Sequence, residues 1–128
     1  FFLFTMSSGD ILSSAAATGN IILVEQLLKD GIDPNDVNAF SRTPLQVMMM
    51  GNPIVAELLL SHGADPNVSD CSTFSTPLHD AAREGFLCTV KVLVQYNADR
   101  NVKDNNSRLP IDLARENGHG DVVAFLEL

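Results

Sequence analysis

Apolar positions recur at helical spacing in four separate parts of the chain. They fall at i, i+3 and i+4 in Val24-Leu27-Leu28, Val55-Leu58-Leu59, Val90-Leu93-Val94 and Val122-Phe125-Leu126. This spacing places the apolar side chains on one face of a helix, so each segment is predicted to be an amphipathic helix that buries one stripe. Small residues precede three of the four segments, around Ala16, Ala81 and Ala114. They predict that another helix precedes each of these amphipathic helices, and that the small side chains let this helix approach its neighbours closely.

Residues that begin and end helices repeat with one period, since Pro44, Pro77 and Pro110 lie 33 residues apart. Proline is favoured at the first position of a helix, and a threonine before it, as at Thr43 and Thr76, can cap the helix. A second set of segments predicts left-handed helix stops and turns, in Gly31-Ile32-Asp33-Pro34-Asn35, Gly63-Ala64-Asp65-Pro66-Asn67 and Asn97-Ala98-Asp99-Arg100-Asn101. One pair of helices cannot bury its own apolar face, so four such units are predicted to stack on a continuous core.

The 33-residue unit and its Thr76-Pro77-Leu78-His79 opening resemble the ankyrin repeat. The resemblance implies an all-α ankyrin-repeat solenoid of four stacked helix-turn-helix units with extended hairpin loops. We place the repeats at about residues 10–42, 43–75, 76–108 and 109–128, within a single domain over residues 10–128. Residues 1–9 are expected to be a disordered or added segment, with Met6 as the natural start.

The second repeat departs from its neighbours in the length of its first helix. From the proline that starts this helix to the glycine between the two helices, the third and fourth repeats span 8 residues, but the second spans only 7, from Pro44 to Gly51. Removing one residue from a helix turns everything after it by about 100°. The first helix of the second repeat is therefore predicted to be a shortened, distorted turn that presents its methionines differently from the other repeats.

Charge and composition exclude several classes of function. The chain has 16 acidic and 8 basic side chains and a net charge of −8, so it repels phosphate backbones and is expected to bind a protein surface rather than nucleic acid. No apolar run approaches the ~20 residues that cross a bilayer, so no membrane partner is expected. Cys71 and Cys88 provide neither a disulfide framework nor zinc spacing, and we expect no metal, no cofactor and an intracellular location.

Two segments, Gln46-Val47-Met48-Met49-Met50-Gly51 and His79-Asp80-Ala81-Ala82-Arg83-Glu84-Gly85-Phe86-Leu87, differ from ordinary ankyrin sequence. Further characteristic segments are Val55-Ala56-Glu57-Leu58-Leu59-Leu60, Arg108-Leu109-Pro110 and Asp112-Leu113-Ala114. With them the chain resembles, from Asp10 to Leu128, the four-repeat members of the ankyrin-type inhibitors of the cyclin D-dependent kinases. That family also has a shortened first helix in its second repeat.

The resemblance implies a non-catalytic inhibitor that acts as a monomer in the cytoplasm and nucleus. Its partners would be the monomeric cyclin-dependent kinases four and six, with repeats two and three beside the ATP cleft and away from the cyclin. The inhibitor would tilt the two kinase lobes and displace the regulatory helix, whose glutamate pairs with the catalytic lysine. Such a mechanism is allosteric, blocks activation by cyclin D and arrests the cell cycle before DNA synthesis.

The residues to which a kinase-binding role is carried over lie in the second and third repeats: Val47, Met49, Met50, Asp70, Asp80, Arg83, Glu84 and Phe86. Asp80 matches the family aspartate that meets a kinase arginine, and a partly desolvated pair of this kind can contribute about 2 kcal/mol or more. The alternative for Asp80 is a solvated carboxylate favoured by the helix dipole. Asp70 matches another family contact, although a turn-forming role is an equal alternative.

The other residues have structural alternatives as well. Val47, Met49 and Met50 could offer soft apolar contacts to a partner or could belong to the core. Arg83 and Glu84 are expected in part to tie neighbouring loops together. Phe86 is expected at the interface or packed on a loop, outside the deep core. His79 is expected to form hydrogen bonds across loops.

Two other classes of function remain open from the residues alone. A generic ankyrin adaptor would bind another protein, such as a transcription factor. It would not need Asp80, the run of three methionines from Met48 to Met50 (the methionine run) or the shortened helix. An enzyme or metal protein would show turnover or bound metal that depends on His79 or Cys71. The chain's histidines form no set of nucleophile, base and orienting group with a serine or cysteine that the repeat period would bring together, so an enzyme is not expected.

Overall fold

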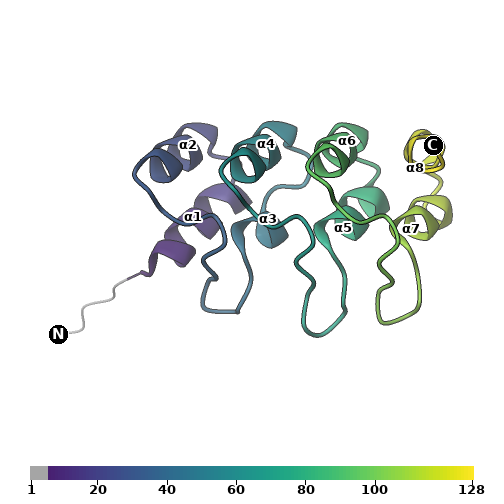
Figure 1. Ribbon diagram of the computed structural model, residues 1–128, viewed down its shortest axis with the longest axis horizontal. Coiled ribbons are helices and arrows are strands. Elements are labelled where there is room, and N and C mark those ends of the chain that lie inside the picture. The colour runs from purple at the N-terminus through teal and green to yellow at the C-terminus, as the bar shows by residue number, and fades with distance from the viewer. Residues whose placement is uncertain (1–5) are drawn as a thin grey trace.

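The computed structural model describes residues 6–128, and the regular secondary structure of these residues is helical. Figure 1 shows the helices in two rows, with the hairpin loops between successive units all projecting to the same side. The helices in chain order are α1 (Ser8–Ala17), α2 (Ile21–Lys29), α3 (Pro44–Val47), α4 (Pro53–Ser61), α5 (Pro77–Glu84), α6 (Leu87–Gln95), α7 (Pro110–Glu116) and α8 (Gly120–Leu126). The predicted all-α solenoid of four stacked helical pairs is confirmed.

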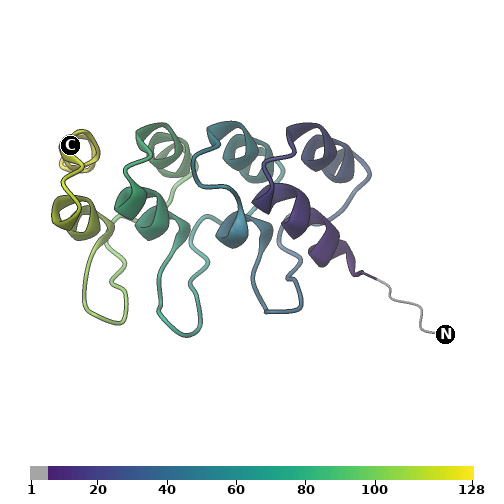
Figure 2. The same cartoon turned by 180° about the vertical axis from the view of Figure 1, so that it is seen from behind.

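The view from behind shows the same two rows, with α1, α3, α5 and α7 in one and α2, α4, α6 and α8 in the other (Figure 2). The core lies between the rows and runs the length of the stack. The second helices of the four units each place one fully buried valine in it: Val24, Val55, Val90 and Val122. The first helices contribute one buried leucine each: Leu12, Leu45, Leu78 and Leu113. Each unit thus buries its apolar stripe against its neighbours, as the sequence period predicts.

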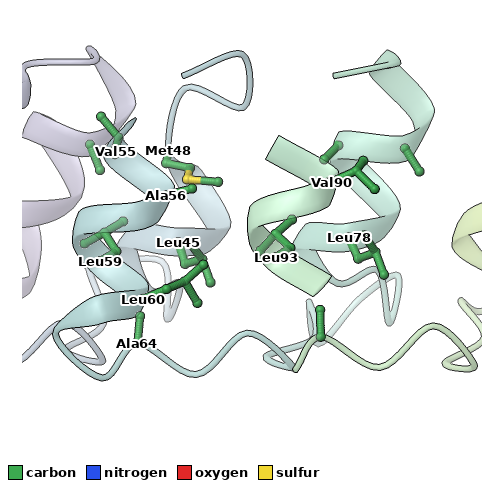
Figure 3. Close-up of a cluster of buried hydrophobic side chains, with 14 of the residues drawn as sticks. Leu45, Met48, Val55, Ala56, Leu59, Leu60, Ala64, Leu78, Val90 and Leu93 are labelled. Carbon is green, nitrogen blue, oxygen red and sulfur yellow. The ribbon is translucent and has the colours of Figure 1, made fainter. Parts of the chain in front are cut away.

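The second and third units show this packing in detail. Figure 3 shows Leu45 and Met48 with Ala56 and Leu60 of α4 in one buried cluster, which continues to Leu78 of the third unit. Met48 is only 4% exposed. Met48 is therefore a core residue, and Met49 and Met50 are the two methionines of the run that are left as candidates for contact with a partner.

The first helix begins before the predicted domain boundary at residue 10. Ser7 caps α1 by accepting a hydrogen bond from the Asp10 amide, and the Asp10 carboxylate accepts one from the Ser7 amide in return. Gly9 is buried, and a Cβ atom there would lie 2.7 Å from the carbonyl carbon of Val37. The prediction that residues 1–9 stand outside the domain was therefore wrong for residues 7–9, because the capping box extends the helix to Ser8. Residues 1–5 lie outside the described part of the chain.

The short helix of the second unit is confirmed: α3 has 4 residues, against 8 in α5. Met48 ends it with an extended backbone, at ψ 159°. The glycines between the helices of the other units, such as Gly85 at φ +79°, adopt the left-handed conformation that glycine favours. Gly51 is absent from the positive-φ residues of the described chain, so the second unit passes from α3 to α4 by a different backbone path.

A longer hairpin loop accompanies the short helix. In the first and last hairpins the closing backbone hydrogen bonds join residues four apart, from the Asn38 amide to Arg42 and from the Asp104 amide to Arg108. In the middle hairpin the corresponding bond joins Asp70 to Ser75, five residues on. The residue missing from α3 is thus replaced in the loop that follows, and the spacing of the helix-starting prolines is unchanged.

Candidate protein-binding site

The three methionines of the run, Met48, Met49 and Met50, differ in how exposed their side chains are. Met49 is 46% exposed, and its amide donates a hydrogen bond to the Ala16 carbonyl at 2.9 Å. Met50 is half-buried against the core, and its carbonyl accepts a hydrogen bond of 2.7 Å from the Thr89 hydroxyl. Of the two predicted contact methionines, Met49 is therefore open to a partner, while Met50 mainly fixes the turn against α6.

Phe86 lies against this turn. It is 39% exposed just before α6, and its ring atom Cζ would be 3.3 Å from a Cβ atom on Gly51. The missing side chain at position 51 leaves room for the aromatic ring. Phe86 is thus outside the deep core, as expected, and its ring lies against the turn that begins at Met49. Val47, at the end of α3, is half-buried on the side facing α1.

Asp80 lies in the first turn of α5 and is held in place by two donors. Its Oδ1 accepts hydrogen bonds of 3.0 Å from the Ser75 hydroxyl and 3.0 Å from the Arg83 guanidinium. The side chains of Asp80 and Arg83 are 32% and 38% exposed, so the pair is open on one side. Within residues 6–128 both bonds end on Oδ1, and Oδ2 accepts no hydrogen bond.

The Asp70 carboxylate, unlike that of Asp80, accepts hydrogen bonds on both of its oxygens. Its Oδ2 accepts a hydrogen bond of 2.9 Å from Nε of Arg42, and its Oδ1 accepts bonds of 2.8 and 2.6 Å from the amide and hydroxyl of Ser72. These bonds, the Ser72 hydroxyl first and the Arg42 guanidinium after it, hold the pKa of the Asp70 carboxyl well below its usual range. Both oxygens are used within the chain, so the arrangement favours the turn-forming alternative for Asp70.

The two aspartates belong to one network around the middle hairpin. The Asp70 amide donates to the Ser75 carbonyl at 2.9 Å, and the Ser75 hydroxyl donates to Asp80. Sequence reasoning missed Arg42 and Ser75, which complete this network. The repeat contained a signal for both, because positions 42, 75 and 108 share the 33-residue period and immediately precede the capping positions.

The remaining predicted residues have separate surroundings. Arg83 also ties the third unit to the fourth, because its carbonyl oxygen lies 2.9 Å from Nε2 of His119. Glu84 is exposed at the end of α5. His79 is fully buried, with Nδ1 accepting from the Thr76 amide at 3.1 Å and Nε2 at 2.9 Å from the Arg108 carbonyl. Its predicted hydrogen bonding across loops is confirmed.

Residues 55–127 match the family model described as ankyrin repeats, three copies. Over 119 residues the chain is 56% identical to cyclin-dependent kinase 4 inhibitor B of Homo sapiens, covering 93% of this chain and 86% of that protein. The corresponding protein of Rattus norvegicus is 56% identical, covering 90% and 88%. Cyclin-dependent kinase inhibitor 2A of Homo sapiens is 53% identical, covering 93% and 76%.

The chain belongs to the ankyrin-repeat inhibitors of the cyclin-dependent kinases. This membership confirms the resemblance drawn from the methionine run and the α5 segment, and it supports an inhibitor over a generic ankyrin adaptor. Both family segments meet in the site, where Phe86 packs on the turn at Gly51. Within residues 6–128, no helix of this family member is both long and apolar enough to cross a bilayer.

Proposed function

We propose that this chain is a non-catalytic inhibitor of cyclin-dependent kinases four and six. It binds the monomeric kinase beside the ATP cleft through its second and third repeats, and it blocks activation by cyclin D. The observation that carries the proposal is an identity of 56% over 93% of the chain with a protein named cyclin-dependent kinase 4 inhibitor B. The segments that distinguish this family from ordinary ankyrin repeats form the exposed site around Met49, Asp80 and Phe86.

Asp80 is the strongest candidate for a charged contact. Ser75 and Arg83 fix the orientation of its carboxylate before a partner arrives, and Oδ2 faces no donor within residues 6–128. A kinase arginine could donate to that oxygen while Arg83 stays in place. Preorganised charge pairs at the centre of an interface are typical hot spots, because little side-chain entropy remains to be lost.

Met49 and Phe86 supply the apolar part of the site. Methionine adapts its shape to a partner, whereas the Phe86 ring is held over Gly51 and offers a fixed surface. Exposed apolar side chains together with one oriented charge match the usual composition of a protein interface, with large apolar anchors near its centre. Asp70 contributes indirectly, since its hydrogen bonds shape the hairpin that carries Ser75.

Inhibition follows from which kinase conformation the chain prefers. A ligand shifts a conformational equilibrium only by its difference in affinity for the two states. Binding beside the cleft, and preferentially to the tilted lobes, holds the regulatory helix away from the catalytic lysine and prevents correct phosphoryl transfer. A stack of four packed units suits this task, because it can contact both lobes without bending between them.

The test is a binding titration of the chain against monomeric cyclin-dependent kinase six, with a cyclin E-dependent kinase as the specificity control. We expect tight binding to the first kinase alone and loss of its cyclin D-dependent activity. Asp80→Asn should weaken binding at least about tenfold, which is ~1.4 kcal/mol. Glu25→Gln, on the exposed side of α2, serves as the control and should bind like the parent chain. Absence of binding by a folded sample would contradict the proposal.

A further inference from the structure

A hollow lies between α1 and the first hairpin loop, and neither Met49 nor Phe86 lines it. Its volume is about 210 Å³, and its walls include Met6, Ser14, Phe40 and Val47. Pockets that bind drug-sized ligands or cofactors usually measure about 300–1,000 Å³. The hollow is therefore of a size for one long side chain of a protein partner.

One carboxylate on the α1 side of the hollow gives it a chemical preference. Ser13 lines the hollow, but its Oγ is closed to solvent and is not open to a ligand. Asp10 lies one helical turn before Ser13 and also lines the hollow. Its Oδ2 accepts hydrogen bonds from the amide and hydroxyl of Ser7, and its Oδ1 accepts one from the Ala39 amide, which leaves Oδ1 able to accept a further bond. These bonds fix the orientation of the carboxylate and lower the pKa of Asp10, so it is charged at neutral pH.

The walls suit the stem of a long basic side chain. Phe40 is 74% exposed, and an aromatic face attracts a cation as well as apolar carbons. Among the described residues that line the hollow, none is basic, and the whole chain has a net charge of −8. An arginine can lay its aliphatic stem on apolar walls while its guanidinium donates to polar atoms at one end.

We propose that this hollow binds an arginine side chain of the kinase partner, with its stem between Phe40 and Val47 and its guanidinium directed to Asp10. This inference rests on the proposed function. It extends the contact surface to the first repeat, which carries none of the eight residues assigned to kinase binding from the sequence. It also adds a second charged contact of the same sign as Asp80, so two carboxylates, one on the first unit and one on the third, would meet a basic kinase surface.

The first experiment measures the affinity of variants for monomeric cyclin-dependent kinase six. Ser14→Phe fills the hollow from an exposed position, and Phe40→Ala removes one wall. We expect each to weaken binding at least tenfold. The controls are Glu25→Phe and Ile22→Ala, exposed on α2 in the same unit, which should bind like the parent chain. Parent-level binding by both hollow variants overturns the inference and leaves the proposed function intact, whereas failure of the parent chain to bind overturns the proposed function itself.

The second experiment needs no kinase. Propylguanidinium and its neutral analogue propylurea are titrated into the labelled protein, and amide chemical shifts of Ser13, Ser14 and Ala17 are followed. Saturable shifts with propylguanidinium, at least tenfold weaker with propylurea and absent in Ser14→Phe, support an arginine site. Equal shifts with both compounds, or none with either, contradict it.

Discussion

The imidazole of His119 lies over Gly85 where the third and fourth units meet. A Cβ atom on Gly85 would be 2.6 Å from Cε1 of His119, while Nε2 of His119 lies 2.9 Å from the carbonyl oxygen of Arg83. The ring is thus fixed at one end by a hydrogen bond and fills the space above the glycine with its other edge. Position 85 requires glycine for two reasons, because its φ of +79° is also unfavourable for any larger residue.

Gly85→Ala should destabilise the protein through both the backbone strain and the displaced ring. We expect the free energy of unfolding in urea to fall by roughly 2–4 kcal/mol. Gly118→Ala is the matched control, since Gly118 has a similar φ of +74° but nothing within 4 Å of a Cβ atom. It should lose only about 1 kcal/mol, from strain alone. Equal losses in the two variants would show that the ring of His119 yields freely.

His79→Ala should be among the most damaging substitutions outside the apolar core. It leaves the Thr76 amide unpaired and removes the bond to the Arg108 carbonyl that joins two hairpins. The unpaired amide, the lost bond and the vacated volume together should cost about 3 kcal/mol or more. Urea unfolding followed by circular dichroism measures this loss. His62→Ala, at an exposed position, should change stability by less than about 0.5 kcal/mol, and a similar loss there would contradict the assigned role of His79.

Asp70→Asn should destabilise the protein at neutral pH and have less effect in acid. The folded-state pKa of Asp70 lies below the ordinary value of 3.8, so its contribution to stability is present above that value and is lost as the pH falls through the folded-state pKa. Unfolding of the parent and variant should be compared at pH 7 and pH 3. The difference between them should shrink at pH 3. A difference that grows in acid would mean that the charge of Asp70 does not stabilise the fold.

Arg100→Ala should loosen the last unit. The Arg100 guanidinium carbon lies 5.4 Å from the centroid of the Phe125 ring, and Nη1 donates to the carbonyls of Leu126 and Leu128 at 3.1 and 3.2 Å. We expect a loss of about 1 kcal/mol and faster amide exchange in α8. Arg115→Ala removes only exposed ion pairs and should cost less than about 0.5 kcal/mol. Unchanged exchange in the Arg100 variant would contradict this capping role.

The sequence predicted the architecture well because each unit repeats the same local chemistry. Capping at Thr43 and Thr76, the left-handed ends at Gly31 and Gly63 and the short helix after Pro44 all appear as expected. These features depend on residues close together in the chain, where propensity and spacing decide the outcome. Met49 and Phe86 are exposed and Asp80 is partly exposed, so all three lie where a partner can reach them.

Contacts between units were harder to predict. The bond from Arg42 to Asp70 joins residues 28 apart, and its geometry depends on how adjacent hairpins lie side by side. The start of α1 lies before the predicted boundary at residue 10, because Ser7 and Asp10 form a capping box whose two members bond only once the helix is formed. The hollow beside Phe40 could not be found from sequence, since its residues come from α1, the first hairpin and α3.

The paired length changes in the second unit have a consequence for protein engineering. A deletion in one repeat would ordinarily put every later repeat out of phase, but the longer loop between Asp70 and Ser75 restores the phase before α5 begins. The shortened helix and the lengthened loop therefore act as a single linked change. Restoring a full-length α3 would require deleting one loop residue at the same time. Grafting this unit into another solenoid would succeed only if the short helix and the long loop are transferred as a pair.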